Sequence, residues 1–185
     1  MATLLPGPFT VETYHKLGEL GIFAEDDRVE LLDGQIVQMT PIGHAHWMAV
    51  FRLSNLLARK TTPDVGISTQ SSLVLSDRWE PEPDIAVLRR PEGYGGHWVP
   101  AARDVVLVIE VADTSLDRDR DLKIPRYAHA GIAEAWLVDV NAHTITCYRD
   151  PRADGYADVV VVRRGGTLRP LQLPDVEISA EQILG

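Results

Sequence analysis

The chain has a single cysteine, Cys147, among its 185 residues. One thiol excludes an internal disulfide and a zinc site built on several thiolates. No stretch approaches the roughly 18 consecutive apolar residues of a membrane-spanning helix. The start, MATLLPGPFT, lacks the basic residues and the long apolar segment of a secretory signal. These absences predict a cytoplasmic protein that does not cross a membrane.

The chain also lacks a positive net charge, the usual mark of a protein that binds nucleic acid over a broad surface. Its 18 Lys and Arg residues stand against 27 Asp and Glu residues, which gives a formal net charge of −9. The segment RDRDLKIPR concentrates basic residues, but the aspartates in and next to it nearly cancel their charge. The composition therefore argues against a basic DNA-coating protein. It does not exclude a nuclease, because a metal site needs carboxylates of its own.

The N-terminal part is predicted to form a helix and a β-hairpin. Thr10 is a suitable N-cap for a helix that ends before Gly21. Asp33-Gly34 separates two short apolar runs, which is the sequence signal of a tight hairpin turn. We expect the helix and the hairpin to occupy residues 10–40.

The pattern over residues 44–140 predicts a layered core. Four apolar residues are spaced to form one stripe along a helix, namely Trp47, Val50, Leu53 and Leu57. The runs VGISTQSSLVL, PDIAVL and DVVLVIEV follow as three strands, and the last two are apolar throughout, as in strands covered on both faces. A second helix, expected to begin near Leu122, and a strand within GIAEAWLVDV complete the order αβββαβ.

This order implies an α/β fold in which a mixed sheet carries a helix on each face. Residues 141–185 add strands, loops punctuated by proline and a short final helix. We expect 10–40, 44–140 and 141–185 to form a single domain over residues 1–185, a length that can bury a core of its own.

Two predicted strands each carry one carboxylate, and a lysine follows on the next helix. Asp84 stands at the head of PDIAVL, Glu110 near the end of VVLVIEV, and Lys123 close to the expected helix start. A buried carboxylate is costly unless it is paired or bound to a metal. The three residues therefore form either a structural ion-paired cluster or a metal site with an ammonium beside it.

On neighbouring strands, the carboxylates of Asp84 and Glu110 would suit one hard cation. Mg²⁺, for which Mn²⁺ can substitute, usually takes one or two protein carboxylates and leaves its other positions to water and phosphate oxygens. Such an ion activates a water for attack on a phosphodiester. The ammonium of Lys123 would then stabilise the charge that builds up or position the water.

Two further residues are candidates for auxiliary roles. Glu30 is either an additional acid near the metal or an exposed strand residue. His46, near the start of the long helix, is either a ligand or phosphate contact or an ordinary helix histidine.

The arrangement PD…E…K resembles the PD-(D/E)xK superfamily of restriction-endonuclease-like nucleases. Over nearly its whole length the chain also resembles Uma-two, a bacterial family of restriction-endonuclease-like domains. The matching segments occur in the family's order and read VELLDGQIVQM, PIGHAHWMAV, PEPDIAVL, VVLVIEVADTSLDRDRDLKIPRYAHAGIAEAWLVDV and RPLQLPDVEISAEQIL. The resemblance implies a Mg²⁺-dependent endonuclease acting on DNA. It also implies metal ligands at Asp84 and Glu110 and a catalytic ammonium at Lys123.

The chain departs from the superfamily in the position of the lysine. The usual lysine lies two residues past the glutamate, where this chain has Ala112. As the resemblance implies, the lysine is instead Lys123 on the following helix. Its long side chain would reach back into the site. The negative charge and the displaced lysine keep open a catalytically inactive nuclease-fold module that binds a partner or nucleic acid. A third alternative is a small-molecule metallohydrolase that uses the same acids. Because restriction-like folds often act as dimers, we also expect a homodimer.

Overall fold

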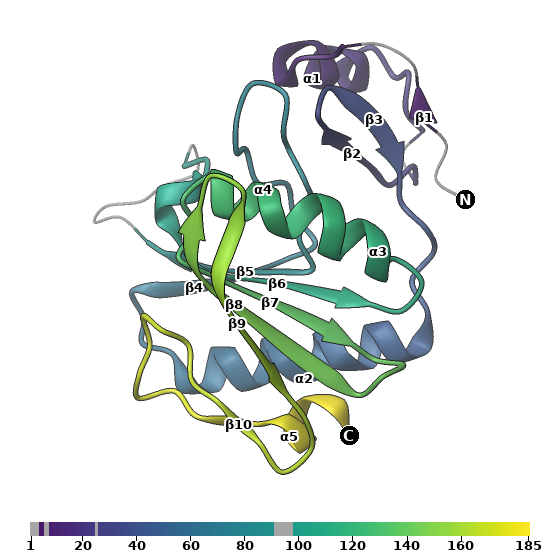
Figure 1. Ribbon diagram of the computed structural model, residues 1–185. Helices are drawn as coiled ribbons and strands as arrows, with labels where there is room; N and C mark the ends of the chain where they lie inside the picture. Colours follow the sequence, from purple (N-terminus) through teal and green to yellow (C-terminus); the bar gives the residue numbers. More distant parts are fainter. Residues whose placement is uncertain (1–3, 6–7, 25, 91–97) are drawn as a thin grey trace.

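A computed structural model describes residues 4–5, 8–24, 26–90 and 98–185 (Figure 1). At its centre a six-stranded mixed sheet has the strand order β4-β5-β6-β7-β8-β9. The strands are β4 (Val65–Thr69), β5 (Ile85–Arg89), β6 (Val105–Ala112), β7 (Glu134–Asp139), β8 (Thr144–Arg152) and β9 (Gly155–Val162). β6 and β7 pair in parallel, and the other neighbours pair antiparallel.

Helices cover both faces of this sheet (Figure 1). One face carries α2 (His44–Lys60), and α5 (Ala180–Leu184) packs beside it. The other face carries a continuous helical stretch composed of α3 (Leu116–Arg118), the π-helical turn η2 (Asp119–Lys123) and α4 (Ile124–His129). The predicted αβββαβ order is confirmed as α2, β4, β5, β6, the α3–α4 stretch and β7.

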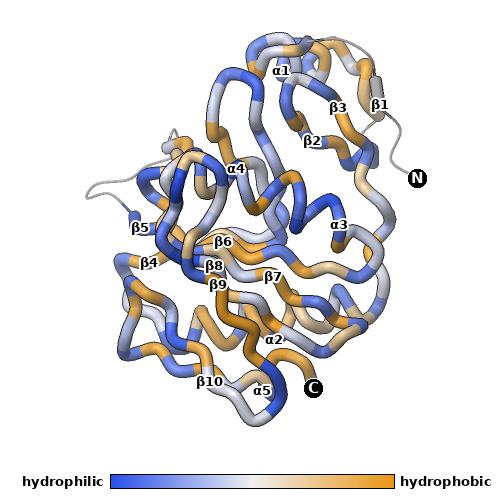
Figure 2. Tube along the Cα trace, in the orientation of Figure 1, coloured by the Kyte–Doolittle hydropathy of each residue, from blue (hydrophilic) through white to orange (hydrophobic). Residues whose placement is uncertain are grey.

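Each face of the sheet has its own hydrophobic core. Leu53 and Leu57 of α2 pack with Ile109 of β6 on one face, while Tyr127 of α4 packs with Val108 on the other. The prediction that Trp47 belongs to the same buried stripe is wrong, because Trp47 is 49% exposed and stacks on Phe51 at the surface of α2. Figure 2 shows hydrophobic residues along the central strands and alternating colours along α2, as expected for a helix with one face on the sheet. Among the described helices, none is long and apolar enough to cross a membrane.

The N-terminal residues form the predicted helix and hairpin at one end of the molecule (Figure 1). The elements are β1 (Leu4–Leu5), α1 (Val11–Glu19), β2 (Val29–Leu32) and β3 (Gln35–Gln38), with the strand order β1-β3-β2. Asp33 and Gly34 have φ values of 51° and 72°, the left-handed conformation at both turn positions that a tight hairpin needs. Two backbone hydrogen bonds join Leu31 to Glu80 and thereby attach the hairpin to the rest of the chain.

The C-terminal residues add a small two-stranded sheet of β10 (Thr167–Leu168) and β11 (Ile178–Ser179) before α5. A one-turn 3₁₀ helix, η1 (Ala102–Asp104), precedes β6. Ser179 caps α5, because its side chain accepts a hydrogen bond from the backbone N–H of Gln182.

Two predicted boundaries are wrong. The strand expected over VGISTQSSLVL ends at Thr69, because Gln70 has a φ of 47° and turns the chain away from the sheet. The second helix begins at Leu116 rather than near Leu122. Pro125 is tolerated because the wider π turn comes just before it, which makes Pro125 a first-turn residue of α4.

Cys147 on β8 is buried, and this burial raises the pKa of its thiol to about 12. Since the thiolate is the reactive form, we expect the native protein to react with a thiol reagent roughly 1,000-fold more slowly than the unfolded chain. Absorbance assays with Ellman's reagent, with and without urea, measure both rates. Equal rates in the native and unfolded protein would contradict this expectation.

Candidate active site

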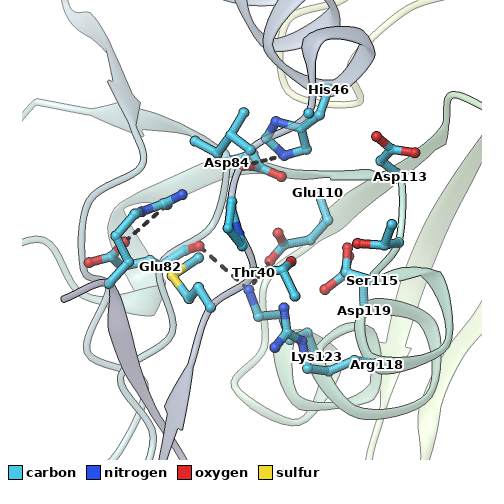
Figure 3. A pocket seen from close by; sticks show the side chains of 16 residues that line it. Thr40, His46, Glu82, Asp84, Glu110, Asp113, Ser115, Arg118, Asp119 and Lys123 are labelled. Carbon is cyan, nitrogen blue, oxygen red and sulfur yellow. Dashed lines mark hydrogen bonds and ion pairs between the residues drawn. The ribbon is translucent and has the colours of Figure 1, made fainter. Parts of the chain in front are cut away.

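A cavity of about 150 Å³ lies where the N-terminus of α2, the ends of β5 and β6, and the α3–α4 stretch meet (Figure 3). Asp84, Glu110, Lys123 and His46, all predicted as site residues, line it. The structure therefore brings together side chains from four separate parts of the chain. Glu30, the fifth predicted residue, lies behind Lys123 and contacts it directly.

Asp84 is positioned by the antiparallel pairing of β5 with β6. Ile85 pairs with Ile109, so the next step along the register sets Asp84 opposite Glu110. The buried Asp84 carboxylate accepts a hydrogen bond of 2.9 Å from the backbone N–H of Val111 through Oδ2. Its other oxygen lies 2.9 Å from Nε2 of His46, which reaches across from α2. The side chain is thus held in one orientation toward the cavity (Figure 3).

Glu110 is held by two donors from the α3–α4 stretch. The hydroxyl of Tyr127 donates a hydrogen bond of 2.5 Å to Oε1, and Nζ of Lys123 lies 3.2 Å from the same oxygen. Both of these donors contact Oε1. None of the described residues donates a hydrogen bond to Oε2, so Oε2 is available to a ligand in the cavity.

Lys123 is enclosed by acceptors. Its ammonium lies 3.0 Å from Oε2 of Glu30, 3.2 Å from Oε1 of Glu110 and 3.5 Å from the backbone oxygen of Glu82. The side chain is only 2% exposed. Burial alone would lower the pKa of Lys123, but the carboxylates of Glu110, Glu30 and Asp119 outweigh it and raise that pKa. The lysine is therefore a buried cation at the centre of an acidic cluster.

Burial governs the titration of the acids around this cation. It raises the pKa of Glu110 to about 8, an effect that Lys123 opposes and that Asp119 and Asp84 reinforce. Burial likewise raises the pKa of Asp119, while Lys123 and a 2.5 Å hydrogen bond from the hydroxyl of Ser115 act against it. Glu110 thus binds a proton near neutral pH more readily than an ordinary glutamate does.

Glu30 is not an exposed strand residue, so that alternative from the sequence is wrong. Its side chain is fully buried on β2, where it pairs with Lys123 and accepts a hydrogen bond from the backbone N–H of Glu82. The fold explains this burial, because the hairpin packs against the segment that leads into β5. Oε1 of Glu30 has no hydrogen-bond partner among the described residues.

Two residues of the helical stretch, Asp119 and Tyr127, share a face with Lys123 and were not among the predicted site residues. Asp119, Lys123 and Tyr127 are spaced four residues apart, so all three point toward Glu110 from one side of the stretch. That spacing was visible in the sequence. Arg118, which also lines the cavity, gives no signal of its own in the sequence, because it lies in a basic segment whose charge is nearly cancelled by aspartates.

The residues present fit a divalent cation with oxygen ligands. Asp84 and Glu110 extend from neighbouring strands into one cavity, and Mg²⁺ commonly takes only one or two protein carboxylates. In the part of the chain that the structure describes, no group of three His, Cys, Asp or Glu side chains is arranged to hold an ion by itself. Water or substrate oxygens would therefore have to supply the remaining ligands.

Comparisons with known proteins agree with the fold. The model of the Uma2 (Uma-two) family, described as "Putative restriction endonuclease", matches residues 11–181. A crystal structure described as that of a "putative nuclease belonging to DUF820" from Anabaena variabilis is similar over 96% of this chain and 98% of that chain. The TM-score is 0.78 at 18% sequence identity, which shows a common fold. No curated protein sequence matches the chain.

Proposed function

The chain belongs to the Uma2 family of restriction-endonuclease-like proteins, and from this premise we propose that it is a Mg²⁺-dependent endonuclease that hydrolyses phosphodiester bonds in DNA. The observation that supports the proposal most directly is the shared cavity of Asp84, Glu110 and Lys123. Metal-assisted hydrolysis of a phosphodiester needs carboxylates that hold the ion and a positively charged group beside them, and all three residues line this cavity.

In this proposal Asp84 and Glu110 would hold the ion, whose chemistry when bound would be to activate a water and to neutralise charge on the phosphate. The protein's own groups keep these two ligands in place. The N–H of Val111 and the imidazole of His46 orient Asp84, while Tyr127 and Lys123 orient Glu110. Mutation of such a partner of a metal ligand commonly lowers the metal affinity or the activity about 10- to 100-fold.

Cleavage of supercoiled plasmid DNA tests the proposal. We expect nicked and linear products with Mg²⁺ or Mn²⁺ and no products in EDTA, because in this proposal the ion activates the water and neutralises the phosphate charge. Gel electrophoresis of the products measures the rate. Purified protein that cleaves no form of DNA or RNA with either metal would contradict the proposal.

Metal binding is expected to strengthen as pH rises toward 8. Because burial raises the pKa of Glu110 to about 8, a cation that binds below this pH must displace a proton. The affinity for Mn²⁺ should therefore rise about tenfold per pH unit between pH 6 and 8 and then level off. Isothermal titration calorimetry measures this, with Glu110→Gln as the control. Wild-type affinity that does not change with pH would contradict the expectation.

A second candidate function is a nuclease-fold module that binds a partner or nucleic acid without cutting it. The net charge of −9 and the full enclosure of Lys123 by acceptors favour this candidate. Calorimetry separates the two, since an inactive module has no need of Mn²⁺ at Asp84 and Glu110. Absence of Mn²⁺ binding at pH 8 would support the second candidate.

We further propose that residues 1–185 form one domain, that two copies associate as a homodimer, and that the protein acts in the cytoplasm. The ion pair between Glu30 of the hairpin and Lys123 of the core supports a single domain.

Two-fold dimers are the commonest assemblies and would present two sites to the two DNA strands. Analytical ultracentrifugation that shows only a 20.5 kDa species would contradict the dimer.

A further inference from the structure

The buried ammonium of Lys123 is already fully used by the protein. An ammonium has three N–H donors, and Lys123 has three acceptors within 3.5 Å, namely Glu30, Glu110 and the backbone oxygen of Glu82. A phosphate group could bind this ammonium only by displacing one of them. The positive contact for a substrate phosphate must therefore come from another side chain.

Arg118, five residues before Lys123, lines the same cavity (Figure 3). Its Nε is buried and has no hydrogen-bond partner, and its guanidinium forms no hydrogen bond or ion pair with a described residue, although its charge helps to lower the pKa of Asp119. Buried donors without partners are rare in native proteins because each one costs stability. An unpaired guanidinium N–H beside a cavity is free to donate to whatever occupies that cavity, whether a water or a ligand oxygen.

The surroundings of the cavity strengthen this interpretation. Four buried side-chain atoms in the described part of the chain lack a hydrogen-bond partner, and three belong to Glu30, His46 and Arg118, in or next to this cavity. Arg28, the other arginine that lines the cavity, already contacts Glu82 at 3.5 Å. Of the two guanidinium groups, Arg118 is thus the one without an ion-pair partner.

The chemistry of the guanidinium indicates the ligand class. Its planar array of N–H groups matches the oxygens of a phosphate and can bind two of them at once. We propose that Arg118, rather than Lys123, is the residue that binds the substrate phosphate, so that Lys123 acts through Glu110. This inference rests on the proposed function, because the phosphate is that of the nucleic-acid substrate.

Arg120 provides a matched control on the same helical stretch. It is paired with Asp117 and Asp121 at 2.8 and 2.7 Å and does not line the cavity. Arg118→Ala and Arg120→Ala remove the same side chain two residues apart. Arg118→Lys keeps the charge but loses the planar fork.

Fluorescence anisotropy of a labelled DNA duplex in EDTA at several salt concentrations provides the binding test. We expect Arg118→Ala to weaken binding about 10- to 100-fold and to reduce the slope of log affinity against log salt by about 1. Arg118→Lys should restore the slope but only part of the affinity. Arg120→Ala should resemble the wild type in both.

Cleavage kinetics and melting separate a substrate contact from a structural role. Arg118→Ala should raise KM in plasmid cleavage and should not lower Tm below that of Arg120→Ala, because Arg118 has no ion pair to lose whereas Arg120 has two. A lower Tm with an unchanged KM and salt slope would show a structural role and overturn the inference. An active wild type with indistinguishable Arg118→Ala and Arg120→Ala variants would overturn it as well. A wild type that neither binds nor cleaves DNA would instead overturn the proposed function together with this inference.

Discussion

Asp84→Asn is expected to lower the rate of metal-dependent DNA cleavage by at least about 100-fold, because even the partners of a metal ligand are commonly worth about 10- to 100-fold. Asparagine has nearly the same shape, and its oxygen can still accept the hydrogen bond from the N–H of Val111. The variant should therefore fold and differ from the wild type mainly in its charge and in its affinity for Mn²⁺. Plasmid cleavage and calorimetry with Mn²⁺ measure the two effects.

Asp154→Asn makes the same chemical change at an exposed turn and is the control for this prediction. It should cleave DNA at the wild-type rate. The metal-site assignment would be wrong if Asp84→Asn kept both the wild-type rate and the wild-type Mn²⁺ affinity. A large drop in Tm would show that Asp84 is needed for folding, and the Mn²⁺ titration of the folded fraction would then decide its role.

Lys123→Met is expected to destabilise the protein by about 3–5 kcal/mol, the usual cost of removing one partner of a buried ion pair. The reason is that Glu30 would remain fully buried with a charge and without its cation. Glu110 contributes less to this cost, because its raised pKa already lets it bind a proton. Urea unfolding measures the change, which corresponds to a fall in Tm of roughly 6–20 °C.

A double variant tests whether the loss comes from this uncompensated charge. Glu30→Gln combined with Lys123→Met removes both charges and should recover most of the stability lost in Lys123→Met. The glutamine oxygen can still accept the hydrogen bond from the backbone N–H of Glu82. If the double variant were no more stable than Lys123→Met, the ion pair with Glu30 would not be the source of the stability.

Local sequence signals predicted the elements well where the backbone itself required a particular residue. Asp33-Gly34 marked the hairpin because both turn positions have positive φ, and Thr10 marked the start of α1 because its hydroxyl accepts a hydrogen bond from the N–H of Thr13. The strand end at Thr69 was missed because Gln70 carries no such signal for its positive φ. The helix start at Leu116 was missed because Pro125 suggested a later one, and the π turn was not foreseen.

The candidate site could be predicted only in part. Asp84 and Glu110 stood out because each is an acid in an apolar strand, and a resemblance to nucleases connected them with Lys123. Whether those residues are metal ligands and a catalytic cation stays a prediction. Glu30 was predicted only as one of two alternatives and Arg118 was not predicted as a site residue, because their environment comes from contacts between segments far apart in the chain.

The sequence by itself determined the order of helices and strands, the family and the three polar residues on which the proposed chemistry depends. The order of elements follows from local periodicity, and the two acids stand out because a carboxylate is costly to bury alone. The family and the link to Lys123 come from the segments that resemble that family. Only the tertiary structure decided that Glu30 encloses Lys123 and that Arg118 faces the cavity without a partner. Burial and hydrogen bonding of a charged side chain depend on which distant segments pack around it, and neither spacing nor composition specifies that.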